Sequence, residues 1–102
     1  MPRPTATWKS IERSAARLFG IERTHWAPDD CRGDGLSLEV KHGKQIPKWL
    51  LKAWQQCIDN CPFGHLPIVV LHPPRWKHKD MLVVMRMEDV LDLMGKRIED
   101  AD

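Results

Sequence analysis

The residues best suited to chemistry lie in one short segment of the chain, residues 28–41. Glu39 and Lys41 are two positions apart in a stretch where apolar and polar residues alternate. In a β-strand, both side chains would therefore project from the polar face. Asp29 and Asp30 lie upstream, on the other side of a Gly-Asp-Gly turn signal. If the segment forms a hairpin, Asp29 or Asp30 brings its carboxylate beside Glu39.

This combination of residues favours metal-dependent hydrolysis of a phosphodiester. Two carboxylates that converge on one point repel each other unless a cation lies between them. Hard oxygen ligands favour Mg²⁺, with Mn²⁺ as a substitute. A lysine beside the ion orients a water molecule and offsets the charge that develops on a phosphate. Taken alone, however, Glu-x-Lys is more often a solvated strand face, and Asp34 within the turn is expected to serve turn geometry first.

Eight elements are predicted to position these residues. Helical spacing of apolar residues predicts a first helix that ends at Gly20, and Pro47 suits the first turn of the second helix. The apolar run 66–71 is predicted to be a fully buried strand. The predicted helices cover residues 7–19, 47–60 and 88–94, and the predicted strands cover 21–26, 28–32, 36–41, 66–71 and 81–85. The order α-β-β-β-α-β-β-α predicts an α/β or α+β protein with a mixed central sheet flanked by helices.

Length and composition restrict the class of protein. The 102 residues predict a single domain over 1–102, with flexible ends at 1–6 and 96–102. No apolar run is long enough to cross a membrane and residues 1–6 have no signal-like apolar segment, so a cytoplasmic protein is expected. Residues 1–79 carry 13 Lys and Arg against 7 Asp and Glu, which favours a polyanionic partner. Three cysteines argue against a disulfide framework.

In this order of elements, the chain resembles the PD-(D/E)XK nuclease superfamily, and more narrowly the small archaeal- and phage-type Holliday junction resolvases. The resemblance covers residues 8–93, most of the chain. Its matching phrases are Trp-Lys-x-x-Glu-Arg-x-x-Ala (8–16), Leu-Ser-Leu-Glu-Val-Lys-His (36–42), Pro-Lys-Trp-Leu (47–50), Leu-Pro-Ile-Val-Val-Leu-His (66–72) and Leu-Val-Val-Met-Arg (82–86). It implies a restriction-endonuclease-like core and Mg²⁺-dependent cleavage of DNA that leaves a 5′-phosphate and a 3′-hydroxyl.

The resemblance also implies a set of metal ligands. Glu39 would bind the metal, and Glu12 on the first helix would complete the site. By its spacing from Glu39, the motif aspartate falls on Asp30. Asp29 keeps the Pro-Asp pair of the motif but lengthens the spacing by one residue, so it is the first alternative, and Asp34 is the next.

The same resemblance assigns the catalytic lysine. The DNA-contacting residues are inferred from their types and positions, and around Trp76 a solvated loop fits equally well. Lys41 would position the water and steady the phosphate. Gln56 matches a glutamine of related nucleases, although an ordinary helix-surface glutamine fits its position equally well. Basic residues near the site would contact phosphates, and Trp76 would stack on an exposed base. The residues in this group are Lys9, Arg13, Arg17, His42, Lys44, Lys48, Lys52, Arg75, Trp76, Lys77, His78 and Lys79.

The function predicted from sequence is therefore a structure-selective DNA endonuclease, with Holliday junction resolution as the leading hypothesis. Two symmetric cuts require two sites, so a C₂ homodimer is expected. The alternatives are a repair or replication nuclease acting on flaps, ends or duplex DNA, and a DNA-binding module that does not cut. A zinc site at Cys57, Cys61 and His65 is a weaker rival, because no fourth ligand follows and buried inert cysteines are commoner.

Overall fold

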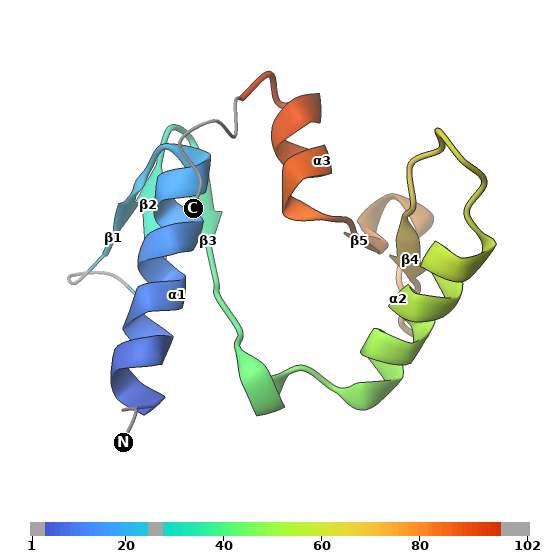
Figure 1. The fold of residues 1–102 in the computed structure, drawn as a ribbon, viewed down its shortest axis with the longest axis horizontal. Helices are drawn as coiled ribbons and strands as arrows, with labels where there is room; N and C mark the ends of the chain where they lie inside the picture. Colours follow the sequence, from blue (N-terminus) through green and yellow to red (C-terminus); the bar gives the residue numbers. More distant parts are fainter. Residues whose placement is uncertain (1–3, 25–27, 97–102) are drawn as a thin grey trace.

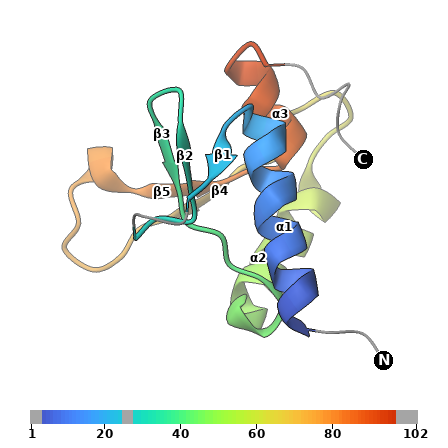
Figure 2. The same cartoon turned by 90° about the vertical axis from the view of Figure 1, so that its left-hand side faces the viewer.

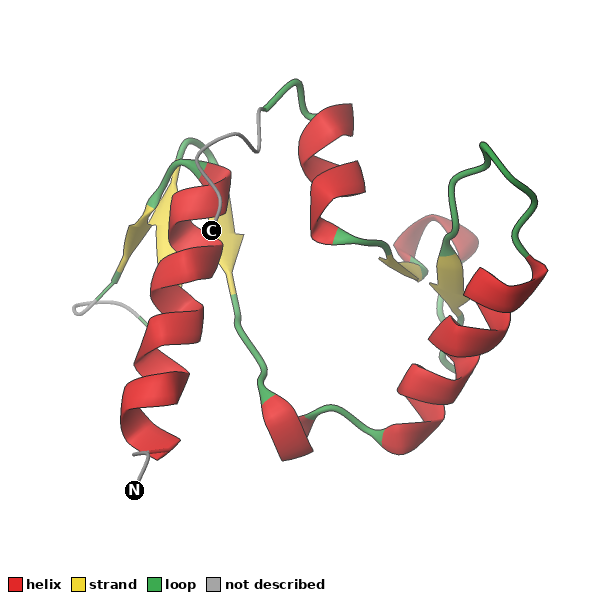
Figure 3. Ribbon diagram, viewed as in Figure 1, coloured by secondary structure: helices red, strands yellow, loops and turns green. Residues whose placement is uncertain are grey.

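The computed structural model describes residues 4–24 and 28–96 of the chain. The elements follow the predicted order and confirm a mixed α and β protein (Figures 1 and 3). They are α1 (Pro4–Phe19), β1 (Glu22–Arg23), β2 (Cys31–Gly33), β3 (Leu36–Leu38), α2 (Lys48–Asn60), β4 (Val69–Leu71), β5 (Leu82–Val84) and α3 (Met87–Leu93), with short 3-10 helices η1 (Gly43–Gln45) and η2 (His78–Asp80).

The ends of the chain were expected to be flexible, and the described residues cover them only in part. Helix α1 begins at Pro4, so residues 4–6 are helical, and residue 96 is also described. Residues 1–3 and 97–102 lie outside the described residues, as do residues 25–27 of the strand predicted over 21–26. None of the helices in the described ranges combines the length and apolar character needed to cross a bilayer.

Helix α1 ends where the sequence predicts, because Gly20 adopts a left-handed conformation with φ of 72°. The amide of Gly20 donates to the carbonyl of Arg17 at 3.0 Å, and the amide of Ile21 donates to the carbonyl of Ala16 at 2.8 Å. This pair of bonds is the Schellman arrangement, which satisfies the last carbonyls of a helix. The chain then reverses directly into β1.

The first sheet is an antiparallel meander in the order β1-β2-β3. Asp34 and Gly35 join β2 to β3 in a two-residue turn, and both have positive φ, at 54° and 78°. Two positive φ values are the signature of a type I′ turn, which the Asp-Gly pair favours because its twist matches that of the strands. The turn fixes a register in which Cys31 pairs with Leu38. The predicted Gly-Asp-Gly hairpin is confirmed.

The second sheet contains only β4 and β5, which pair antiparallel. The prediction that residues 66–71 form a fully buried strand was wrong. Only Val69–Leu71 is a strand, and Ile68 and Val70 remain 41% and 55% exposed. Helix α2 packs on β4 and covers one face of this sheet, so alternate side chains on the other face remain accessible.

The strands therefore form two small sheets, where the sequence predicted one mixed central sheet. Within residues 4–24 and 28–96, no ladder joins β3 to β4. After β3 the chain runs through η1 into α2, which packs on β4, while α1 packs on β1 and β2. Figure 1 shows these two groups on opposite sides with α3 between them. The radius of gyration is 15.4 Å, against about 13 Å for a compact chain of this length.

Candidate active site

The candidate site lies at the open end of the β2–β3 hairpin, beyond the last paired residues. The last paired residues of the hairpin are Cys31 and Leu38, and Asp30 lies just beyond them, beside the residues that flank Glu39. Two hydrogen bonds hold this arrangement. The amide of Asp30 donates to the carbonyl of Leu38 at 2.9 Å, and Oδ2 of Asp30 accepts from the amide of Val40 at 2.6 Å. The carbonyl of Asp30 accepts from the amide of Thr24 on the other side, so Asp30 departs from regular strand pairing. Its carboxylate is bound to the backbone between Glu39 and Lys41.

Glu39 and Lys41 project from the exposed face of the strand and its extension. Burial alternates from Leu36 to His42, with the even-numbered residues part-buried and the odd-numbered residues exposed. Oε2 of Glu39 lies 3.5 Å from Nζ of Lys41, and their side chains are 60% and 55% exposed. Both groups are thus open to a ligand arriving from solvent, on the polar face that the sequence predicts.

Asp29, the alternative motif aspartate, is already bound by protein partners. Its two carboxylate oxygens accept hydrogen bonds from Nε of Arg32 at 3.0 Å and from Nη2 of Arg32 at 2.9 Å. The hydroxyl of Ser37 donates a third bond at 2.6 Å. These donors hold the pKa of the Asp29 carboxyl below its usual value. The carbonyl of Asp29 also accepts a bond from the hydroxyl of Thr24, which ties down the bend before β2.

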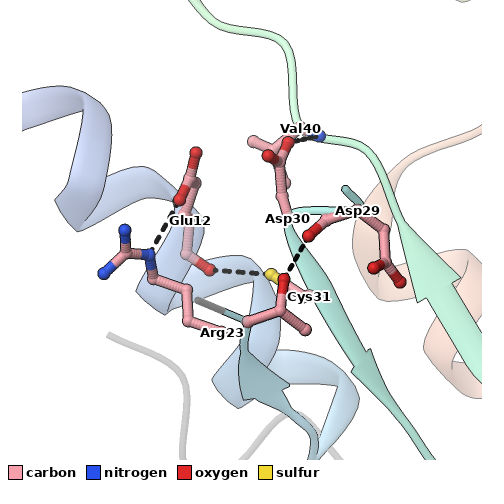
Figure 4. Close-up of polar contacts among 7 residues, drawn as sticks. Glu12, Arg23, Asp29, Asp30, Cys31 and Val40 are labelled. Carbon is pink, nitrogen blue, oxygen red and sulfur yellow. Dashed lines mark hydrogen bonds and ion pairs between the residues drawn. The ribbon is translucent and has the colours of Figure 1, made fainter. Parts of the chain in front are cut away.

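Glu12 is the only buried charged residue among the described residues, with an exposure of 3%. Its Oε1 accepts a bond of 2.8 Å from Nε of Arg23 on β1, so the buried carboxylate is paired with a cation (Figure 4). The thiol of Cys31 lies 3.5 Å from the backbone carbonyl of Glu12 and joins β2 to the helix. Glu12 thus faces the sheet, whereas a glutamate on a helix is usually exposed.

The buried thiol of Cys31 shows which charged groups surround the site. Burial raises the pKa of Cys31 above 9.0, and the negative charges of Glu12 and then Asp30 raise it further, while Arg23 lowers it. Glu12 and Asp30 therefore both lie near the same sulfur atom, one on α1 and one before β2 (Figure 4). The sequence reasoning missed Arg23, Ser37 and Cys31 as parts of this site. Among them only Ser37 carried a signal, since it lies on the polar face of the Glu-x-Lys strand.

The carboxylates of Asp30 and Glu39 are donors of the kind that a hard divalent cation prefers. Within the described ranges, no three His, Cys, Asp or Glu side chains come together as a metal-binding group. Mg²⁺ commonly binds proteins through one or two carboxylates and completes its shell with waters and substrate phosphates. Asp30 and Glu39, from neighbouring segments of the hairpin, are the candidates for such a pair. Asp34 lies at the opposite end of the hairpin, where its Oδ2 is 2.9 Å from Nζ of Lys96.

The sulfur and imidazole groups proposed for zinc make other contacts. The thiol of Cys57 lies 3.5 Å from the carbonyl of Ile68. The thiol of Cys61 lies 3.5 Å from the carbonyl of His65, and Nδ1 of His65 lies 3.2 Å from that of Phe63. These side chains hold the connection between α2 and β4.

The structure separates the remaining predicted residues into three places. Gln56 is exposed on α2, away from the hairpin (Figure 1). Lys9, Arg13 and Arg17 are exposed and follow each other at intervals of four residues on α1. Arg13 and Arg17, together with Arg23, help to line an open cavity of about 520 Å³. His42, Lys44, Lys48 and Lys52 follow the hairpin on η1 and α2, and all but part-buried His42 are exposed. Arg75, Trp76, Lys77, His78 and Lys79 form an exposed loop between β4 and β5.

Comparison of the chain with protein-family models, with curated proteins and with solved structures finds no match. The interpretation of the site therefore depends on its own geometry.

Proposed function

We propose that this protein is a Mg²⁺-dependent DNA endonuclease of the PD-(D/E)XK type that acts on branched DNA such as a four-way junction. The observation that carries the proposal is the Asp30 carboxylate bound to the Val40 amide, between Glu39 and Lys41, which lie together on the exposed face. Phosphodiester hydrolysis needs a metal-binding carboxylate pair, a cation beside the phosphate and open access. This end of the hairpin offers all three.

Each residue has a distinct task in the proposed reaction. Bound Mg²⁺ supplies a Lewis acid and lowers the pKa of a coordinated water. Asp30 and Glu39 hold the metal through their carboxylate oxygens. The ammonium of Lys41 has three donors, which orient the attacking water and offset the growing charge on a phosphate oxygen. Glu12 is the third ligand that the resemblance implies, and it would have to give up its bond to Arg23 to take that role.

Affinity for DNA is proposed to come from basic side chains that contact phosphates without reading sequence. The exposed row of Lys9, Arg13 and Arg17 lies on α1, which packs on β1 and β2 of the sheet that carries the site. Resolution of a junction also requires two cuts, so the active species is proposed to be a homodimer. The protein leaves many large apolar side chains exposed, including Trp49 at 58% and Leu51 at 55%, which supplies area for such contact.

The test is cleavage of a labelled four-way junction with Mg²⁺, with Mn²⁺ and with chelator. We expect Glu39→Gln and Lys41→Ala to lose about a hundredfold or more in rate while binding the junction normally. Glu22→Gln, which removes an exposed carboxylate from β1, is the matched control and is expected to cut like wild type. If Glu39→Gln and Lys41→Ala both cut like wild type, the site is misassigned.

Substrate form and oligomeric state separate the alternatives. Faster cutting of flapped, blunt-ended or linear DNA than of the junction would favour the repair or replication nuclease. Junction binding without cleavage in either metal would favour the non-cleaving module. Sedimentation that shows only monomer, free and on junction DNA, would exclude paired cutting.

A further inference from the structure

The connection between β4 and β5, residues 72–81, forms a built loop rather than a simple linker. It projects from the second sheet away from the helices (Figure 2). Nε2 of His72 donates to the carbonyl of Trp76 at 2.9 Å, and the rings of His72 and His78 meet edge to face with centroids 5.6 Å apart. The amide of Met81 donates to the carbonyl of His78 at 3.2 Å and closes the loop toward β5. These contacts hold the loop backbone at Trp76 in place.

The backbone at Arg75 is strained. The amide of Trp76 donates to the carbonyl of Pro73 at 3.2 Å, which closes a turn with Pro74 and Arg75 at its centre. Arg75 has φ of 68°, the value that a type II turn requires at its third position, where Gly or Asn is usual. An arginine held in this conformation costs conformational energy, and such strain concentrates at binding sites. We therefore expect the guanidinium of Arg75 to take part in ligand binding.

The loop borders an open, shallow cavity of about 450 Å³, which is lined by Arg75, Trp76, Lys77 and Asp80. The tryptophan is 44% exposed, so part of its ring is available to a ligand. Two of the lining residues are cations, one is an aromatic ring, and one is a carboxylate. This set matches three parts of a nucleotide: its phosphates, the face of its base, and the amino groups on the edge of its base.

We infer that this cavity binds an unpaired nucleotide of single-stranded DNA, a subsite separate from the cleavage site. Trp76 stacks on the base, as aromatic side chains do in single-strand binding sites. Arg75 and Lys77 contact the flanking phosphates. The carboxylate of Asp80 accepts hydrogen bonds from base amino and imino groups, and guanine offers both on one edge, so guanine is preferred to thymine. The choice of DNA as the ligand rests on the proposed nuclease function.

The first test is fluorescence anisotropy of a labelled oligo-dT strand carrying one central guanine, measured with chelator so that no cleavage occurs. Trp76→Leu keeps apolar bulk without a π-face, and we expect it to weaken binding roughly 5- to 100-fold. Trp76→Phe keeps a π-face and should lose far less. Phe63→Ala removes a fully exposed aromatic ring from the α2–β4 connection and serves as the control. If Trp76→Leu binds as tightly as wild type, the inference is overturned.

Two further variants test the charged residues. Arg75→Gly relieves the positive φ, so we expect an equal or higher melting temperature together with a salt slope reduced by about 0.7, one phosphate contact on a single strand. An unchanged slope would remove Arg75 from the subsite. Asp80→Asn should abolish the preference for the guanine-containing strand over plain oligo-dT. Equal binding of the two strands by wild type would overturn the role of Asp80, and tighter binding of oligo-U would overturn the assignment to DNA.

These measurements fail independently of the nuclease proposal. Binding that depends on Trp76 in a protein that never cuts DNA would support the subsite and refute the nuclease. Cleavage that depends on Glu39 in a protein whose single-strand binding ignores Trp76 would do the reverse.

Discussion

Asp30 is hydrogen-bonded to both chain neighbours of Glu39. Its amide donates to the carbonyl of Leu38, and its carboxylate accepts from the amide of Val40. The aspartate therefore fixes the backbone on both sides of the glutamate. Asp30 is for this reason both a proposed ligand and a residue that positions the other proposed ligand.

The two candidate motif aspartates are expected to respond differently to removal of charge. Asp30→Asn should reduce cleavage about a hundredfold or more, because it replaces the charged ligand with a neutral amide, whose oxygen can still accept from the Val40 amide. Asp29→Asn should retain most of the activity, since the Asp29 carboxylate is occupied by Arg32 and Ser37. Initial rates against Mg²⁺ concentration check both variants. Loss of activity in Asp29→Asn alone would transfer the motif position to Asp29, and Asp34→Asn tests the remaining candidate.

The buried ion pair between Glu12 and Arg23 makes a prediction about stability. Arg23→Met leaves a carboxylate of 3% exposure without its partner, at a cost of about 3 kcal/mol in unfolding free energy. Glu12→Gln keeps an acceptor for Nε of Arg23 and should cost about 1 kcal/mol. Urea denaturation of the two variants measures the difference. A larger loss in Glu12→Gln than in Arg23→Met would contradict this account of the pair.

The type I′ turn makes a prediction about conformational strain. At Gly35, φ is 78° and the space where a Cβ would stand is open. Gly35→Ala should therefore destabilise the protein by about 1 kcal/mol through backbone strain alone. Gly35→Asn should recover part of this loss, because asparagine tolerates the left-handed region. Thermal or urea unfolding of both variants provides the comparison, and equal losses would mean that strain is not the cause.

Asp29 makes a prediction about acid stability. Its folded pKa lies below its usual value of 3.8, so the unfolded state binds protons first as the pH falls. The stabilisation is complete above the unfolded pKa and is lost as the pH falls through the folded pKa. Asp29→Asn should therefore be less stable than wild type at neutral pH, and the difference should shrink below about pH 4. Unfolding curves at several pH values test the sign of this change.

The basic row on α1 makes a prediction about salt dependence. If Lys9 and Arg13 each contact one phosphate, replacing both with alanine reduces the slope of log affinity against log salt on duplex DNA by about 2. The loss should be the same for unrelated sequences, because phosphate contacts carry no sequence information. Arg86→Ala, which removes an exposed cation with no proposed DNA contact, provides the comparison from outside α1. A slope that stays unchanged in the double variant would remove α1 from the DNA interface.

Local pattern predicted much of the fold. Apolar spacing located α1 and α2, Gly20 marked a helix end through its left-handed φ, and the Asp-Gly turn set the hairpin register. Because register decides which residues are neighbours, the same signal predicted that the segment before β2 returns beside the Glu39 strand, where Asp30 bonds to Leu38 and Val40. Each of these features depends on residues that are close in the sequence.

The features that depend on distant partners were not predictable in this way. A run such as 66–71 indicates an apolar strand but not how many faces will be covered, and the two-stranded sheet leaves Val70 exposed. The bond from Arg23 to Glu12 spans 11 positions between a helix and a strand, and no periodicity encodes it. The separation into two sheets likewise depends on where α2 packs.

Every strand pairing in the described residues joins strands that follow each other in the chain: β1 with β2, β2 with β3, and β4 with β5. Such a topology closes only short loops as it forms, so its contact order is low and its search through conformations is brief. The meander that holds Asp30 beside the Glu39 backbone thus has the connectivity of a rapidly folding unit. As this half leaves the ribosome, its pairing need not wait for synthesis of the half that follows.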